Sequence, residues 1–150
     1  MQMRSIEIIV GAFMLAGIIS LAVLAIRVSG FNVGTETDTY SLYARFENIG
    51  GLVRRSKVSI GGVVIGRVAD ISLDQETYTA LVRMEIDRDV QTISTDTTAA
   101  ILTDGLLGGK YIGLSLGAEE EFLGSGDEIM DTQSAIVLEE LIGKFLLNKF

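Results

Sequence analysis

The sequence predicts a mainly β protein, in which one small β domain lies between an apolar N-terminal helix and an amphipathic C-terminal helix. Three observations support this fold class. Residues 8–26 form an uncharged apolar run, short alternating segments broken by glycine fill residues 40–116, and apolar side chains recur at helical spacing after residue 135. A chain of 150 residues has room for one modest domain with attachments.

The apolar run has the properties of a membrane anchor. A helix over residues 8–26 would span about 28 Å, close to the ~30 Å thickness of the hydrocarbon core of a bilayer. Arg4 and Arg27 flank the run. A cleaved signal peptide is the alternative, but the run is longer than the roughly 7–15 apolar residues of such peptides. We therefore assign residues 1–29 to a short N-terminal stub and a retained transmembrane helix.

Two further features of the anchor bear on its surroundings. Arg4 and the N-terminal amine favour a cytoplasmic N-terminus, whereas Arg27 on the far side weakens this bias. Ala12, Ala16 and Ser20 recur every four residues and form a stripe of small side chains. Such a stripe allows close packing of a second transmembrane helix. A plain lipid-facing surface is the alternative interpretation of the same stripe.

The middle of the chain is predicted to form a series of short strands. After a polar linker over residues 30–39, residues 40–46 alternate in the manner of a half-buried strand. Turn signals separate the later candidates, and no helical pattern intervenes. Roughly six or seven strands in so short a region predict a small antiparallel barrel or sandwich, whose limited core favours oligomerisation. The other strand candidates are residues 58–60, 63–73, 78–86, 97–103 and 110–116.

The C-terminal segment predicts a helix over residues 135–147, capped by Asp131 or Thr132. Its apolar side chains occupy two sectors, so packing against a single sheet would leave one of them exposed. Such a helix suits a bundle formed with copies of itself. The alternative is one helix folded back onto its own barrel. The main apolar stripe consists of Leu138, Leu141, Ile142 and Phe145.

Composition argues against several classes of function. The chain has no histidine and no cysteine, which removes the commonest general base, the commonest zinc ligand and the usual nucleophile pairs. The net charge is −8, and because residues 1–27 contribute +1, the remaining residues carry −9. An acidic body disfavours nucleic-acid binding. The acidic group Glu85, Asp87 and Asp89 is better explained as a solvated strand face than as a calcium site.

A glycine-framed leucine pair is the most distinctive motif. Gly105, Gly108 and Gly109 surround Leu106 and Leu107 between two predicted strands. The segment does not match a phosphate-binding loop, because its glycine spacing is one residue short and a tyrosine replaces the magnesium-binding hydroxyl residue. Exposing a leucine forgoes about 1.5–3 kcal/mol of burial free energy. The two leucines are thus expected to be buried against something, either their own barrel or a shared collar in a ring of subunits.

Three segments together resemble the MCE domain family. They are Val-Ser-Ile-Gly-Gly-Val-Val-Ile-Gly-Arg-Val at 58–68, Gly-Leu-Leu-Gly at 105–108 and Lys-Tyr-Ile at 110–112. The tail, residues 131–143, is similar to the MlaD-like branch of that family. The sequence departs from the family in one place, since many relatives have a proline near the position of Ser56 and Lys57.

The resemblance implies a fold and an assembly. Proteins of this branch form homohexameric rings of seven-stranded β-barrels on the periplasmic side of the bacterial inner membrane. They associate with an ABC permease, an ATPase and a STAS-domain subunit, and they exchange phospholipid with a soluble periplasmic carrier to maintain outer-membrane lipid asymmetry. The barrel would occupy residues 39–117 and the bundle-forming helix residues 132–150.

The resemblance also assigns roles to residues. Leu106 and Leu107 would line a central apolar pore, and the C-terminal helices would form a bundle. The chain itself would not be an enzyme and would need neither cofactor nor metal, since ATP hydrolysis would belong to a partner. The alternative is a structural adaptor that clamps a transporter without conducting lipid. An anchored hydrolase is a third option, for which the chain has no recognisable nucleophile motif.

Overall fold

The computed structural model describes residues 2–29 and 38–149. The chain divides into two units, Met1–Glu36 and Thr37–Phe150, which are described separately below. Most of the predicted linker, residues 30–37, lies outside the described residues, as do Met1 and Phe150.

The first unit is a single helix, α1 (Gln2–Val28). Its segment Met3–Val28 is long and apolar enough to cross a membrane. The helix includes the predicted uncharged run and extends past it at both ends, so that Arg27 lies in its last turn. The prediction of one N-terminal apolar helix is confirmed.

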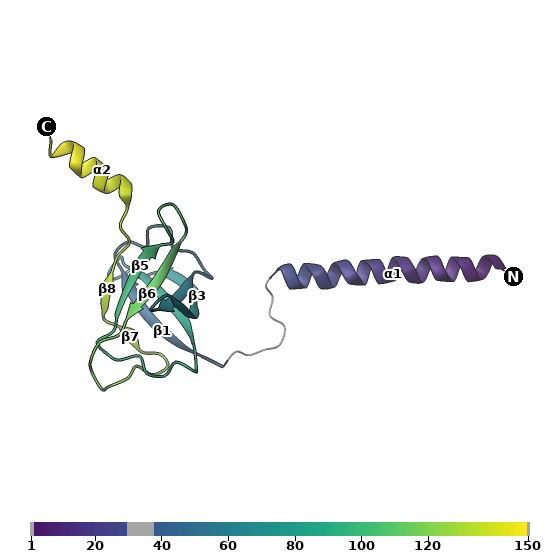
Figure 1. The fold of residues 1–150 in the computed structure, drawn as a ribbon, viewed down its shortest axis with the longest axis horizontal. Helices are drawn as coiled ribbons and strands as arrows, with labels where there is room; N and C mark the ends of the chain where they lie inside the picture. Colours follow the sequence, from purple (N-terminus) through teal and green to yellow (C-terminus); the bar gives the residue numbers. More distant parts are fainter. Residues whose placement is uncertain (1, 30–37, 150) are drawn as a thin grey trace. The chain divides into compact units, whose positions relative to one another are not determined.

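The second unit is built on one mixed sheet that closes into a near-barrel (Figure 1). Neighbouring strands are antiparallel except for three parallel pairs, β2 with β6, β1 with β7 and β5 with β8. The strand order is β7-β1-β4-β3-β2-β6-β5-β8. The strands are β1 (Thr39–Phe46), β2 (Lys57–Ile60), β3 (Val63–Leu73), β4 (Ala80–Asp87), β5 (Thr98–Thr103), β6 (Lys110–Ser115), β7 (Glu128–Ile129) and β8 (Asp131–Gln133).

The sheet closes through its last two strands. β7 and β8 follow one another in the chain with Met130 between them, yet they pair at opposite edges of the sheet. Ile129 pairs with Ala44 of β1, whereas Asp131 pairs with Thr98 of β5. A short segment therefore brings the two edges together. The prediction of a mainly β barrel is confirmed, but the prediction of seven strands is wrong, because the sheet has eight.

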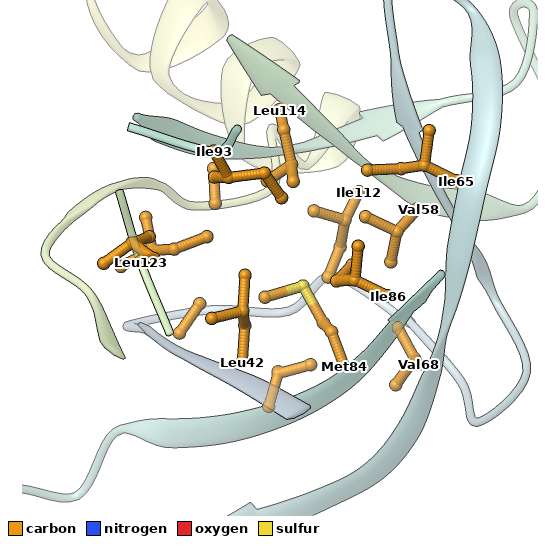
Figure 2. Packing of buried hydrophobic residues seen from close by; sticks show 14 of the residues in the cluster. Leu42, Val58, Ile65, Val68, Met84, Ile86, Ile93, Ile112, Leu114 and Leu123 are labelled. Atoms are coloured by element: carbon orange, nitrogen blue, oxygen red, sulfur yellow. The ribbon is translucent and has the colours of Figure 1, made fainter. Parts of the chain in front are cut away.

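Side chains fill the interior of the barrel. Every second residue of β1 points inward, and the inward residues of β4 meet them (Figure 2). Leu42, Phe46, Met84 and Ile112 have no exposed surface. A small barrel of this kind has a solid core and leaves no channel along its axis. Any path for a ligand must therefore lie outside the barrel.

Strand β4 begins later than the alternation predicts. Residues 78–86 were expected to form one strand, but β4 starts at Ala80. Tyr78 has a φ of 54° and is 77% exposed, so it lies in the turn before the strand and not on the inner face. The N–H of Asp74 donates to the carbonyl of Thr79 and closes this turn. The correct inward residues are Val82, Met84 and Ile86.

The C-terminal helix is shorter than predicted. Helix α2 (Leu138–Leu147) begins three residues after Ala135, the predicted start. The predicted caps are wrong, because Asp131 and Thr132 belong to β8 and pair with β5. Val137 occupies the N-cap position and makes no side-chain capping hydrogen bond. None of the described side chains of α2 is buried.

Candidate functional site

Strand directions place the turn between β3 and β4 and three further segments at one end of the barrel. β1 runs antiparallel to β4, β4 to β3 and β3 to β2, while β2 is parallel to β6. Consequently β6 starts at the end where β1 finishes. This end, which we call the loop end, carries residues 47–51, residues 104–109 and residues 134–137 (Figure 1).

The leucine loop, residues 104–109, is held at its base. The N–H of Asp104 donates to the carbonyl of Gly109 at 3.0 Å, which closes the turn between β5 and β6. The Asp104 carboxylate pairs with Lys57 Nζ at 2.8 Å. The same ammonium lies 4.7 Å from the ring centroid of Tyr111. These contacts fix where the loop leaves the barrel.

The tip of the loop projects away from the barrel. Leu106 is 87% exposed and Leu107 is 95% exposed. The loop therefore does not fold over its own barrel, which was one of the two expectations for these leucines. The described residues thus leave most of the surface of both leucines uncovered.

Two of the three loop glycines are required by geometry. Gly105 has a φ of +70°, a conformation that other residues adopt at a cost. A Cβ on Gly108 would lie 1.9 Å from the carbonyl oxygen of Asp104. A Cβ on Gly109 would meet nothing within 4 Å. The loop conformation thus depends on glycine at 105 and 108.

The chain leading to α2 is fastened to the turn after β1. The N–H of Ala135 donates to the carbonyl of Asn48 at 3.0 Å, and the Ser134 hydroxyl accepts from the N–H of Glu47 at 3.1 Å. A Cβ on Gly50 would lie 2.4 Å from the Cβ of Ala135, so glycine permits this close approach. Lys110 Nζ donates to the carbonyl of Ile136 at 3.3 Å.

Helix α2 presents an apolar surface with no partner in the described chain. The four residues of the predicted stripe are each at least half exposed, from 51% for Leu141 to 67% for Phe145. A cleft of about 210 Å³ joins the first residues of α2 to the leucine loop. The leucine loop and the start of α2 therefore form one continuous region at the loop end, in which apolar side chains lie beside Lys110 and Glu139.

Comparisons with known proteins identify the family. The sequence model of the family described as "MlaD protein" matches residues 38–117. The chain is 46% identical to the "Intermembrane phospholipid transport system binding protein MlaD" of Escherichia coli (strain K12), over 97% of this chain and 82% of the relative. The chain belongs to the MlaD family. The MlaD protein of Haemophilus influenzae is 44% identical, over 93% of this chain and 86% of the relative.

A solved structure extends the likeness of this MlaD-family chain to three dimensions. A chain of the "Acinetobacter MlaFEDB complex in ATP-bound Vtrans1 conformation" matches with a TM-score of 0.73 and 32% identity. The match covers 95% of this chain and 99% of the Acinetobacter chain. The likeness therefore includes the barrel and the segments that flank it.

The predicted packing stripe of the MlaD-family anchor lies on α1. Ala12, Ala16 and Ser20 are all exposed, as are the other described side chains of this helix. A Cβ added at Gly17 would meet nothing within 4 Å. The stripe is thus free to contact a second helix, and its role stays a prediction.

Acidic residues at the opposite end of the barrel hold loops together. The Asp96 carboxylate accepts a hydrogen bond from the N–H of Ala118 at 2.8 Å. Burial raises the pKa of Asp96, but hydrogen bonds from Ser94, Ala118 and Glu119 outweigh it, so the pKa is lower than the usual value. Among residues 2–29 and 38–149, no group of three acidic side chains is arranged to hold a metal ion.

Sequence reasoning found the leucine loop but missed the residues that orient it. Lys110 and the turn at Asn48 and Gly50 tie the loop base to the start of α2. The signal in the sequence was the Asn-Ile-Gly-Gly turn, whose glycine allows another segment to approach closely. Its partner, at Ala135, lies far along the chain and could not be read from local patterns.

Proposed function

We propose that this chain is the lipid-handling subunit of an ABC-type phospholipid transport system. In this proposal six copies form a ring, and phospholipid passes through its centre between the inner-membrane permease and a soluble periplasmic carrier. The transfer maintains the lipid asymmetry of the outer membrane. The supporting comparison is the E. coli relative, whose name describes an intermembrane phospholipid transport system.

The exposed leucine pair is the observation that carries the proposal. Leu107 is 95% exposed at the tip of a loop whose base is fixed. The solid barrel core excludes a path through one subunit, whereas six loops converging on a ring axis would make an apolar collar. Such a collar passes acyl chains and resists ions, because a charge in an apolar passage loses its hydration.

The other surfaces have roles in the same assembly. The stripe of Leu138, Leu141, Ile142 and Phe145 would be buried in a bundle of α2 helices next to the collar. Helix α1 would cross the inner membrane once, with a cytoplasmic N-terminus and a periplasmic barrel. The stripe of Ala12, Ala16 and Ser20 would pack against a permease helix. An ATPase and a STAS-domain subunit would complete the transporter on the cytoplasmic side.

A charge in the collar tests the proposal. The variant Leu107→Asp, assembled with the transporter in proteoliposomes, is expected to lose transfer of fluorescent phospholipid to the carrier. Leu116→Asp is the matched control, because Leu116 is an exposed leucine just after β6, at the opposite end of the barrel. Normal transfer by Leu107→Asp would exclude a pore at this loop.

The structural adaptor is the second candidate, since an exposed apolar loop can also bind protein. Photo-crosslinking amino acids at positions 106 and 107 separate the two functions. The conduit predicts crosslinks to phospholipid, whereas the adaptor predicts crosslinks to protein alone. Native-mass measurement of the detergent-solubilised full chain is expected to give a hexamer with phospholipid retained.

A further inference from the structure

The cleft at the loop end combines apolar and charged groups. Its lining includes the two loop leucines and, from the chain leading into α2, Ile136, Val137 and Leu138. Lys110 and Glu139 also line it, one bearing a positive and the other a negative charge. A surface that is apolar with two opposite charges is suited to an amphiphile that carries both charges.

The lysine of the cleft has no counterion. Lys110 Nζ donates to two neutral oxygens, Thr103 Oγ1 at 2.5 Å and the Ile136 carbonyl at 3.3 Å. Within the described residues no carboxylate lies within 4.0 Å of this ammonium. The nearby Lys57, by contrast, is paired with Asp104. A part-buried cation without an ionic partner, in a body with a charge of −9, favours an anionic group in the cleft.

The carboxylate of the cleft restricts the ligand further. Glu139 lies in the first turn of α2 and forms no ion pair with any described residue. A headgroup with a phosphate alone would place its charge near this carboxylate without compensation. A headgroup that also carries an ammonium can satisfy Lys110 and Glu139 together.

The size of the cleft indicates which part of the ligand it holds. Its volume of about 210 Å³ exceeds that of an engineered protein cavity of ~150 Å³ that binds benzene. That volume takes a headgroup and the first methylenes of a chain, but not a whole phospholipid. The remaining hydrocarbon would lie over Leu106 and Leu107, which are exposed beside it.

We propose that this cleft is a subsite for the headgroup of a zwitterionic glycerophospholipid, in which Lys110 binds the phosphate and Glu139 binds the ammonium. This inference rests on the proposed function, and it adds a headgroup preference to it. One subsite in each subunit would hold lipid beside the collar before or after passage. The site lies within one chain, so it does not require the ring to be complete.

Photolabelling of the full chain in dodecyl maltoside tests the subsite. The probe is phosphatidylethanolamine with a diazirine near the glycerol end of one acyl chain, and mass spectrometry locates the label. We expect label on residues 136–138. Lys110→Met should reduce this label about tenfold or more, as expected for loss of a charge-assisted hydrogen bond, and Lys110→Arg should restore most of it.

The comparison probes and controls decide whether both charges matter. Phosphatidylglycerol with the same diazirine should label residues 136–138 less, and Glu139→Gln should abolish that difference. Lys144→Met, which removes a lysine of α2 outside the cleft, should leave the label unchanged. Equal labelling by a diacylglycerol probe, unchanged labelling of Lys110→Met, or displacement of the lipid probe by an equimolar amount of inorganic phosphate would each overturn the proposal.

The outcome is separable from that of the proposed function. If crosslinkers at positions 106 and 107 capture phospholipid while residues 136–138 remain unlabelled, the subsite is excluded and the conduit stands. If positions 106 and 107 capture only protein, the conduit itself is excluded. A circular dichroism spectrum equal to that of the unaltered chain establishes that each variant is folded.

Discussion

In the barrel interior Leu42, Phe46 and Met84 have no exposed surface, whereas at the loop end Leu107 is 95% exposed and Phe145 is 67% exposed. The interior residues find their partners within one chain. The loop-end residues belong to the same chemical class, but the described chain offers them no partner. The interior therefore determines whether the barrel folds, and the loop end offers exposed apolar surface for contact with another molecule.

The largest expected effect is a difference in the free energy of unfolding between a variant in the barrel interior and a variant at the loop end. Phe46→Ala should lower the free energy of unfolding by about 3–5 kcal/mol, because it leaves a cavity in a solid core. Leu106→Ala should change it by less than about 0.5 kcal/mol, as for an exposed position. Urea denaturation of the full chain, at a protein and detergent concentration at which the native mass is that of a single chain, measures both when it is followed by circular dichroism. Equal losses would show that the leucine loop packs on its own barrel.

A smaller effect is expected within the leucine loop. Gly108→Ala should destabilise the loop by about 1–3 kcal/mol, since the added methyl group overlaps the Asp104 carbonyl. Gly109→Ala adds the same group where nothing lies within 4 Å, so it should be nearly neutral. Hydrogen exchange at the Asp104 N–H reports the closing hydrogen bond of the loop. Similar exchange in both variants would contradict the steric explanation.

Helix α2 should affect assembly without affecting the barrel. Phe145→Ser is expected to change the free energy of unfolding of the dissociated single chain by less than about 0.5 kcal/mol, since the ring is exposed in the single chain. The same variant should shift the native mass from the hexamer to smaller species. Val28→Ser, at an exposed position of α1, is a control for loss of an apolar group. If Phe145→Ser remained an intact hexamer, the conclusion would be that Phe145 of α2 does not contribute to the contacts between subunits.

The smallest expected effect is the dependence of stability on pH that comes from Asp74, in the turn after β3. A hydrogen bond from the Glu76 N–H, and then one from Arg45, lower the pKa of Asp74 from its ordinary 3.8. A carboxyl group with a lowered pKa in the folded state stabilises the fold above the unfolded pKa, and this contribution is lost as the pH falls through the folded pKa. Denaturation midpoints should therefore fall from about pH 5 downward, and Asp74→Asn should reduce that dependence. If the denaturation midpoint of Asp74→Asn fell with pH as steeply as that of the unaltered chain, other carboxylates would account for the loss of stability in acid.

Local patterns predicted the strands with clear alternation and failed for the shortest ones. β1 alternates over its whole length, and its inward residues follow from the period of two. β7 and β8 have two and three residues, too few to show a period, and they pair with strands far away in the sequence. Asp131 and Thr132 resemble helix caps because their side chains suit that role, but pairing with β5 determines their conformation.

The candidate site was also predictable only in part, because local patterns reveal the loop but not the contacts between distant segments. Two leucines among glycines mark an exposed loop on local grounds alone. The cleft, however, depends on Lys110, on the turn near Gly50 and on the start of α2 coming together through the barrel. No local pattern encodes that meeting, because it follows from the order of the strands in the closed sheet.

The closing segment around Met130 has a consequence for biosynthesis. β1 emerges early from the ribosome, yet one of its edges is not covered until Ile129 of β7 has been made. One edge of β5 likewise stays unpaired until Asp131 of β8 has been made. At about 5–20 residues per second, β1 remains unpaired on that side for several seconds. The last few residues of the domain thus end the period in which an open sheet edge can pair with another nascent chain.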